Sequence, residues 1–90
     1  MTKQEKIDAL EKMIKGVNEF IPSYSDGMCR ILSLLYFNDV CSDDEFDYVE
    51  DLIGKVPVSV YEDETYVWKR GEKAPRIKWL KEQIEILEKQ

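Results

Sequence analysis

Apolar and charged positions alternate over residues 2–21 with the period of an α-helix. The apolar side chains recur at steps of three and four residues, at Ile7, Leu10, Ile14, Val17 and Ile21. Thr2 and Glu5 have the spacing of a capping box, in which each side chain satisfies a free backbone N–H of the first turn. Pro22 disfavours helical geometry in the residue before it. The pattern therefore predicts a helix that begins after Thr2 and ends near Phe20 or Ile21.

Two further helices are predicted in the middle of the chain. Residues 28–38 are apolar on nearly every side, which is typical of a helix at the centre of a small fold. Ser42 and Glu45 form a second capping box, and Gly54 stands where a helix commonly ends. Between Glu45 and Gly54, the apolar residues Phe46, Val49, Leu52 and Ile53 lie on one face. We expect a central helix over 28–38 and a short third helix that ends near Gly54.

The apolar period changes from helical to alternating after Lys55. Valines stand at positions 56, 58 and 60, and residues 65–68 are again rich in strand-forming residues. Pro57 lacks the N–H that a central strand needs, so a first strand would lie at a sheet edge. The pattern predicts a small β-hairpin over residues 55–69, and an extended segment across the helices is the alternative.

A final helix is indicated at Pro75, because proline suits the first helical turn. Apolar residues then form a heptad-like seam at Ile77, Leu80, Ile84 and Leu87. The seam is too short for an independent coiled coil, so we expect it to pack on the chain's own helices or on a second copy. Together these patterns predict a mainly α fold of about four helices, with the hairpin or extended segment before the last one, in a single small domain over residues 1–90.

Charge is distributed unevenly along the chain, whose formal net charge is -6. Residues 38–67 hold ten acids and one base, whereas residues 68–81 hold six bases and one acid. The overall negative charge argues against binding of bulk nucleic acid, although a local basic patch can hold a small anion. No apolar run reaches the length of about 20 residues that a membrane span needs. We therefore expect no membrane partner.

The cysteine and histidine content limits the metal chemistry. The chain has two cysteines, Cys29 and Cys41, and no histidine, so a tetrahedral zinc site would need unusual carboxylate ligands. The acids at positions 43–47 lack the glycine and the final glutamate of a calcium loop, and they suit a helix N-terminus instead. The first residues lack the apolar core of a signal peptide, which favours reduced thiols in a cytoplasm. We expect no metal, no cofactor and no disulfide.

Cations gather at the predicted start of the last helix, where the helix dipole normally favours anions. Basic side chains there can cradle phosphates, and an indole can stack on a base, so a small anionic nucleotide fits these residue types best. The candidate ligand-binding residues are Trp68, Lys69, Arg70, Lys73, Arg76 and Trp79. Structural explanations stay open, because indoles and guanidinium groups also form core contacts and a basic turn can pair with the chain's own acids.

Catalytic residues are not indicated. A nucleophile needs a nearby base, and without histidine no spacing singles one out. The serines lie in no nucleophile-elbow context, and no glycine-rich phosphate loop occurs. We expect a binding protein rather than an enzyme.

Residues 35–40 with 47–53 form one recognisable part of the chain, and Trp68 to Gly71 followed by Pro75 to Leu80 form another. Together they resemble small uncharacterised proteins of tailed bacteriophages, in which an aromatic-glycine turn precedes a proline-arginine helix. The resemblance implies a non-enzymatic counter-defence factor that acts in the cytoplasm of a bacterial host by binding a component of its immunity. It assigns no functional residues.

Three hypotheses for function follow. In the first, the basic segment sequesters an anionic nucleotide signal of bacterial immunity, and self-association through the last helix would complete or double the site. In the alternative, an acidic surface mimics a nucleic-acid backbone and blocks a host defence protein by direct contact, as some anti-CRISPR proteins do. Its carboxylates are those of Asp39, Asp43, Asp44, Glu45, Asp47, Glu50 and Asp51. A third option is contact with a phage or host protein through exposed aromatic side chains.

Overall fold

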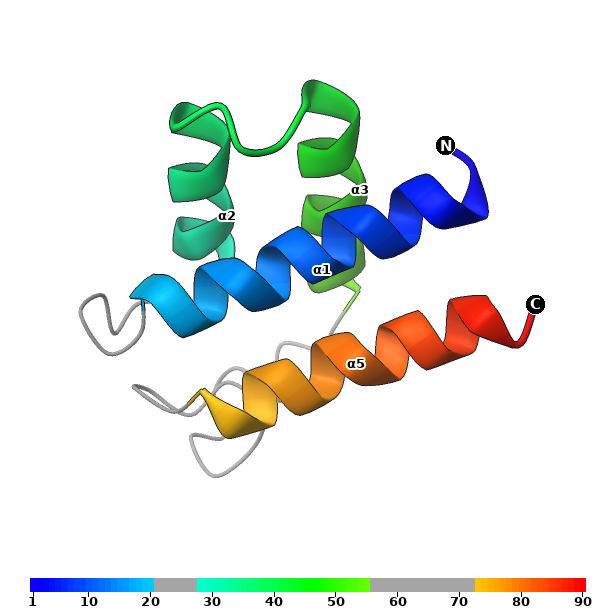
Figure 1. Cartoon of the computed structure of the whole chain (residues 1–90). Helices are drawn as coiled ribbons and strands as arrows, with labels where there is room; N and C mark the ends of the chain where they lie inside the picture. Colours follow the sequence, from blue (N-terminus) through cyan, green and yellow to red (C-terminus); the bar gives the residue numbers. More distant parts are fainter. Residues whose placement is uncertain (21–27, 56–72) are drawn as a thin grey trace.

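The computed structural model describes residues 1–20, 28–55 and 73–90 of the chain (Figure 1). These residues form four helices, α1 (Lys3–Phe20), α2 (Met28–Phe37), α3 (Asp43–Gly54) and α5 (Ala74–Glu88), and no strand. The expectation of a mainly helical protein is confirmed. The predicted hairpin over residues 55–69 lies outside the described residues except for Lys55, which is the C-cap of α3.

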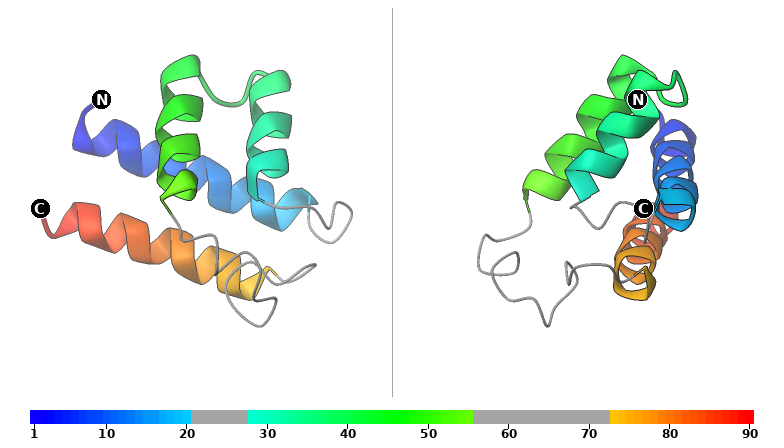
Figure 2. Two further views of the ribbon diagram at one scale, coloured as in Figure 1. Left: turned by 180° about the vertical axis from the view of Figure 1, so that it is seen from behind. Right: turned by 90° about the vertical axis from the view of Figure 1, so that its left-hand side faces the viewer.

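The other three described helices all pack against α1. α1 and α5 lie side by side and run in opposite directions, so that residues 1 and 90 lie at the same end (Figure 1). α2 and α3 form an antiparallel pair that stands across α1, and their connecting loop points away from α5 (Figure 2). The backbone of α1 approaches each of the other three helices, whereas that of α5 approaches neither α2 nor α3. The helix at the centre is therefore α1, contrary to the expectation for residues 28–38.

α2 is more one-sided than its composition suggests. Its buried residues, Met28, Ile31, Leu32 and Leu35, recur at steps of three, one and three along the helix. At 100° per residue they fall within one stripe, and Phe37 lies on the opposite face. The Phe37 side chain is 78% exposed.

Both predicted capping boxes are present. At the start of α1, the N–H of Glu5 donates to Thr2 Oγ1 at 3.1 Å, and the N–H of Thr2 donates to Glu5 Oε1 at 3.0 Å. At the start of α3, the N–H of Glu45 donates to Ser42 Oγ at 3.2 Å, and the N–H of Ser42 donates to Glu45 Oε1 at 2.9 Å. Pro75 lies in the first turn of α5, as predicted. The starts of α1, α3 and α5 therefore follow local signals in the sequence.

The turn after α2 closes with a Schellman motif. The N–H of Val40 donates to the carbonyl of Leu35 at 2.9 Å, and the N–H of Asp39 donates to the carbonyl of Tyr36 at 3.1 Å. Asp39 occupies the left-handed position of the motif, with φ of 58°, where glycine is usual. This reversal lets residues 38–42 turn the chain so that α3 packs against α2.

Buried side chains from all four helices and from the α2–α3 loop form one core. Its members are Ala9, Leu10, Met13, Val17, Met28, Ile31, Leu32, Leu35, Cys41, Val49, Ile53, Leu80 and Leu87. Gly16 is also buried, because α2 crosses α1 there at close range. A Cβ atom at Gly16 would lie 3.0 Å from Leu35 Cδ1 and 3.1 Å from Ile31 Cγ2.

Candidate functional site

Three of the six predicted ligand-binding residues lie in the described part of the chain. These are Lys73, which is the N-cap of α5, and Arg76 and Trp79 within that helix. Arg76 is 1% exposed, and Trp79 is half-buried and packs against the hydrophobic core. Trp68, Lys69 and Arg70 lie outside the described residues. Arg76 therefore lies in the packed interior, and the indole of Trp79 lies at the edge of the core.

Lys73 contacts the neighbouring helix. Its Nζ donates a hydrogen bond to the backbone carbonyl of Asn18 at 3.0 Å. This carbonyl belongs to the last turn of α1, where the helix leaves carbonyl groups unpaired and the dipole is negative. Because α1 and α5 are antiparallel, the cation that precedes α5 complements the C-terminal end of α1. An external anion would have to compete with this contact for the ammonium group of Lys73.

The same arrangement occurs at the opposite end of the helix pair. Lys3, the first residue of α1, donates from Nζ to the backbone carbonyl of Gln90 at 2.8 Å. Each helix of the pair therefore carries a lysine near its N-terminus that reaches a carbonyl at the C-terminal end of its neighbour. This contact explains the position of Lys73 without any ligand.

The two cysteines are free thiols. Loss of hydration raises the pKa of the Cys29 thiol, and the nearby Glu50 carboxylate raises it further. Burial and then the Glu45 carboxylate raise the pKa of the Cys41 thiol, against a smaller opposite effect of Lys12. The reactive thiolate is therefore disfavoured at neutral pH at both positions.

Residues 1–20, 28–55 and 73–90 contain no group of three or more histidine, cysteine, aspartate or glutamate residues that could hold a metal ion. No helix in these ranges is both long and apolar enough to cross a membrane.

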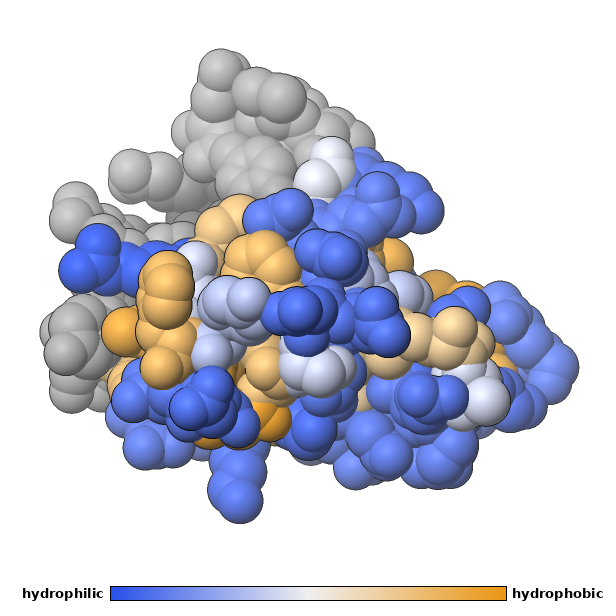
Figure 3. All heavy atoms as spheres, turned by 90° about the horizontal axis from the view of Figure 1, so that it is seen from above, coloured by the Kyte–Doolittle hydropathy of each residue, from blue (hydrophilic) through white to orange (hydrophobic). Residues whose placement is uncertain are grey.

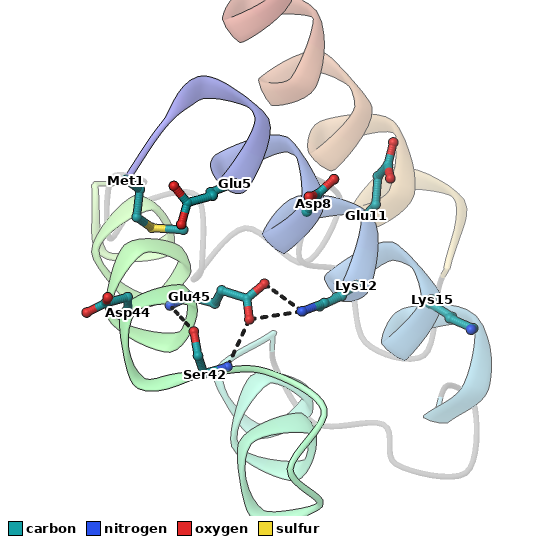
Figure 4. A pocket seen from close by; sticks show the side chains of 9 residues that line it. All are labelled: Met1, Glu5, Asp8, Glu11, Lys12, Lys15, Ser42, Asp44 and Glu45. Carbon is teal, nitrogen blue, oxygen red and sulfur yellow. Dashed lines mark hydrogen bonds and ion pairs between the residues drawn. The ribbon is translucent and has the colours of Figure 1, made fainter.

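A groove of about 500 Å³ lies between α1 and the start of α3 (Figure 4). It is lined by Met1, Glu5, Asp8, Glu11, Lys12, Lys15, Ser42, Asp44 and Glu45. Lys12 Nζ lies 2.8 Å from Glu45 Oε2 and 2.9 Å from Glu45 Oε1, and this carboxylate also completes the capping box with Ser42. Asp8 and Glu11 point away from the ion pair (Figure 4). The ion pair of Lys12 and Glu45 in this groove therefore joins α1 to α3.

The outer face of α3 is densely acidic. Asp43, Asp44, Asp47, Glu50 and Asp51 are all exposed, and we call these five residues the acidic face. Lys55 Nζ lies 3.1 Å from Asp51 Oδ2, but both side chains are 71% exposed, so water screens the pair strongly. Glu45 is the one α3 carboxylate of the predicted acidic surface that turns inward, toward Lys12. Asp39 is exposed on the adjoining loop.

Aromatic side chains adjoin the acidic face. The ring of Tyr36 packs on Phe46, with centroids 5.0 Å apart, and on Phe37, with centroids 5.7 Å apart. A hydrogen bond to Asp43 raises the pKa of Tyr36, and the charges of Asp43, Asp47 and Asp39 raise it further. Tyr36 therefore contacts Phe37 and also hydrogen-bonds to Asp43, the first carboxylate of the acidic face. Seen from above, hydrophobic surface gathers on the α2 side and hydrophilic surface over α3 (Figure 3).

The sequence prediction did not identify Phe37 as a surface residue. The signal was present, because Met28, Ile31, Leu32 and Leu35 form one stripe and Phe37 lies opposite. A reading of α2 as apolar on nearly every side obscured that stripe.

Comparison of the chain with models of protein families, with curated proteins and with solved structures gives no match.

Proposed function

We propose that this protein is a non-enzymatic binding protein that docks the acidic face of α3, together with Phe37, on a basic surface of a partner protein. The observation that carries the proposal is that Tyr36 joins a 78% exposed Phe37 to Asp43, the first of five exposed carboxylates on α3. Exposed aromatic residues supply much of the affinity at protein interfaces, and complementary charge speeds association and selects the partner.

The spacing of the carboxylates supports a basic nucleic-acid-binding surface as the partner. Asp43, Asp47 and Asp51 follow one another at four-residue steps, and Glu50 lies beside them. Side chains one helical turn apart are separated by about 5–6 Å, so α3 presents a regular row of negative charges. A groove that neutralises successive phosphates with lysine and arginine would accept such a row. In the terms of the bacteriophage resemblance, the partner would be a host defence protein.

The nucleotide hypothesis stays a prediction. Lys73, Arg76 and Trp79 all have contacts within the chain, and these contacts give the hypothesis no support from the geometry. Calorimetric titration of the protein with cyclic and linear nucleotides tests it directly, because a bound nucleotide gives a saturable heat.

The experiment for the proposed function is capture of partner proteins from a bacterial lysate on the immobilised chain. The test variant is Asp47→Asn/Glu50→Gln/Asp51→Asn. The matched control is Asp8→Asn/Glu11→Gln/Glu19→Gln, which removes three exposed carboxylates from α1 instead. We expect the wild type and the control to retain the same basic protein, and the test variant to retain it at least about tenfold more weakly.

Two further measurements define the contact. Added double-stranded DNA or RNA should release the captured protein, because the nucleic acid and the acidic face compete for the same basic groove. Phe37→Ala should weaken capture by about tenfold or more without loss of stability, since the side chain is exposed in the free protein. Equal capture by the wild type and the acidic-face variant, or capture that nucleic acid does not disturb, would contradict the proposal.

A further inference from the structure

The outer face of α5 carries a self-complementary charge pattern. A groove of about 550 Å³ runs along it and is lined by Ala74, Ile77, Lys78, Lys81, Glu82 and Glu85. The lysines occupy the first half of the groove and the glutamates the second half. Lys78 and Glu85 lie equally far from the midpoint between Lys81 and Glu82, so the pattern of charge reverses sign about that point.

These four charges are available for a partner. All four side chains are exposed. Steps of four residues would allow pairs within the helix, of Lys78 with Glu82 and of Lys81 with Glu85. Among the residues that the structure describes, however, the ion pairs within 4.0 Å are Lys12–Glu45 and Lys55–Asp51, and α5 contributes to neither.

The face also lies clear of the helix packing. Arg76, Leu80 and Leu87 are the buried residues of α5, and α1 is the described helix that α5 packs against. At 100° per residue, the exposed groove residues lie on the side opposite to these buried ones. Ile77 is half-buried at the edge of the groove and offers apolar surface there.

We propose that two copies of this chain associate through this face, with their α5 helices antiparallel about a two-fold axis beside Lys81 and Glu82. In this arrangement Lys78 of one protomer lies opposite Glu85 of its partner, and Lys81 lies opposite Glu82. A two-fold axis repeats each contact, so four opposite-charge pairs form around the apolar edge. A parallel arrangement would bring lysine to lysine and glutamate to glutamate, which is unfavourable.

The dimer is independent of the function proposed above. The α2–α3 loop points away from α5, so both acidic faces would remain accessible in the dimer (Figure 2). Two linked copies of a binding surface raise the effective affinity for a partner that offers two sites. The charge pairs are exposed, so the association is expected to weaken with salt.

The test is sedimentation equilibrium of the full chain over micromolar to millimolar concentrations. We expect a monomer–dimer equilibrium up to twice the chain mass of 10.6 kDa at about 0.05 M NaCl, and a shift toward monomer at about 0.5 M. Lys78→Glu/Lys81→Glu and Glu82→Lys/Glu85→Lys should each weaken dimerisation at least about tenfold. The first exchange makes the net charge more negative and the second makes it less negative, so a loss in both excludes a simple effect of total charge.

Mixing these two variants should restore a dimer that contains one copy of each, since every facing pair then has opposite charge. The fourfold exchange Lys78→Glu/Lys81→Glu/Glu82→Lys/Glu85→Lys keeps the net charge of the wild type. It should restore self-association, because each facing pair again has opposite charge. A wild-type chain that stays monomeric at low salt up to millimolar concentration overturns the proposal. A wild-type dimer that either double exchange leaves intact overturns it as well, because the association then uses another surface.

Discussion

Asp39 holds the backbone conformation with the clearest energetic cost in the described residues. Its φ of 58° is left-handed, and a Cβ atom makes that region unfavourable for most residues. The two hydrogen bonds of the Schellman motif fix this geometry. Sequence reasoning could not foresee it, because Asn38 and Asp39 are both tolerated in left-handed turns and the choice depends on where α2 ends.

Asp39→Gly should therefore stabilise the protein. Glycine removes the steric cost, while its greater freedom in the unfolded chain offsets part of the gain, so we expect the free energy of unfolding to rise by about 0.5–1 kcal/mol. Urea denaturation measures this change. Asp39→Ala is the matched control, because it removes the charge but keeps the Cβ atom. An equal gain from alanine would point to relief of repulsion among the acids instead of relief of backbone strain.

Gly16 and Gly54 allow a second comparison between single residues. A Cβ atom at Gly16 would press on Leu35 and Ile31, whereas one at Gly54 would meet nothing within 4 Å. Alanine improves helix propensity by up to about 1 kcal/mol at either position. We expect Gly54→Ala to stabilise by about 0.5 kcal/mol, Gly16→Ala to be nearly neutral, and Gly16→Val to destabilise by about 1–3 kcal/mol through overpacking. If thermal unfolding showed that Gly16→Val stabilises the protein, the expected overpacking would be contradicted, and α2 would be able to move away from α1 at this position.

At the scale of single elements, the start of α3 combines capping and tertiary contact. Glu45 caps Ser42 and pairs with Lys12 of α1, and its side chain is 14% exposed. Burial raises the pKa of Glu45, but the hydrogen bonds from Lys12 and Ser42 outweigh burial, so the pKa lies below its usual 4.5. The sequence predicted the capping box, since it is a local pattern. It did not predict Lys12 as the partner, because that contact depends on how α1 crosses α3.

This lowered pKa gives a pH dependence with a defined sign. A carboxylate with a depressed pKa in the folded state contributes stability above its unfolded pKa of 4.5, and the contribution disappears as the pH falls through the folded value. Glu45→Gln keeps an acceptor for the cap and loses the charge, so we expect a loss of about 0.5–1 kcal/mol at neutral pH. Urea denaturation at pH 7 and at successively lower pH below 4.5 should show the difference from wild type shrink in acid. A difference that stays constant with pH would exclude the ion pair as its cause.

The start of α5 shows where reasoning from one helix fails. Considered alone, cations before a helix are unfavourable, which predicts an external anion as their partner. In the structure, the N-terminus of α5 lies beside the C-terminus of α1, and Lys73 bonds to Asn18 there. The helix pair, and not the single helix, determines whether a terminal charge is favourable.

At the scale of the whole molecule, the periodic pattern predicted the described helices but not their arrangement. Caps, prolines and apolar stripes are local, so the bounds of α1, α2 and α3 and the start of α5 followed from the sequence. The central place of α1 depends on which stripes face one another, and no local signal carries that information. The exposed position of Phe37, on which the proposed function depends, follows from the same packing.

The central place of α1 predicts unequal costs for core substitutions. Leu10→Ala removes a fully buried side chain from α1, which contacts the three other described helices. We expect a loss of about 2–5 kcal/mol, a large part of the stability of a small domain. Leu87→Ala, in the last turn of α5, should cost less, because helix ends can adjust. Thermal unfolding compares the two, and a larger effect of the α5 substitution would show that α1 is not the central element.

The side-by-side position of residues 1 and 90 has a practical consequence. Lys3 and Gln90 are joined by a hydrogen bond, so the two ends of the polypeptide leave the fold from the same place. A protein with this geometry can be inserted into a surface loop of a fluorescent host without being stretched. Because the α2–α3 loop points away from α5, such a chimera would display the acidic face outward and report on its binding from within a living cell.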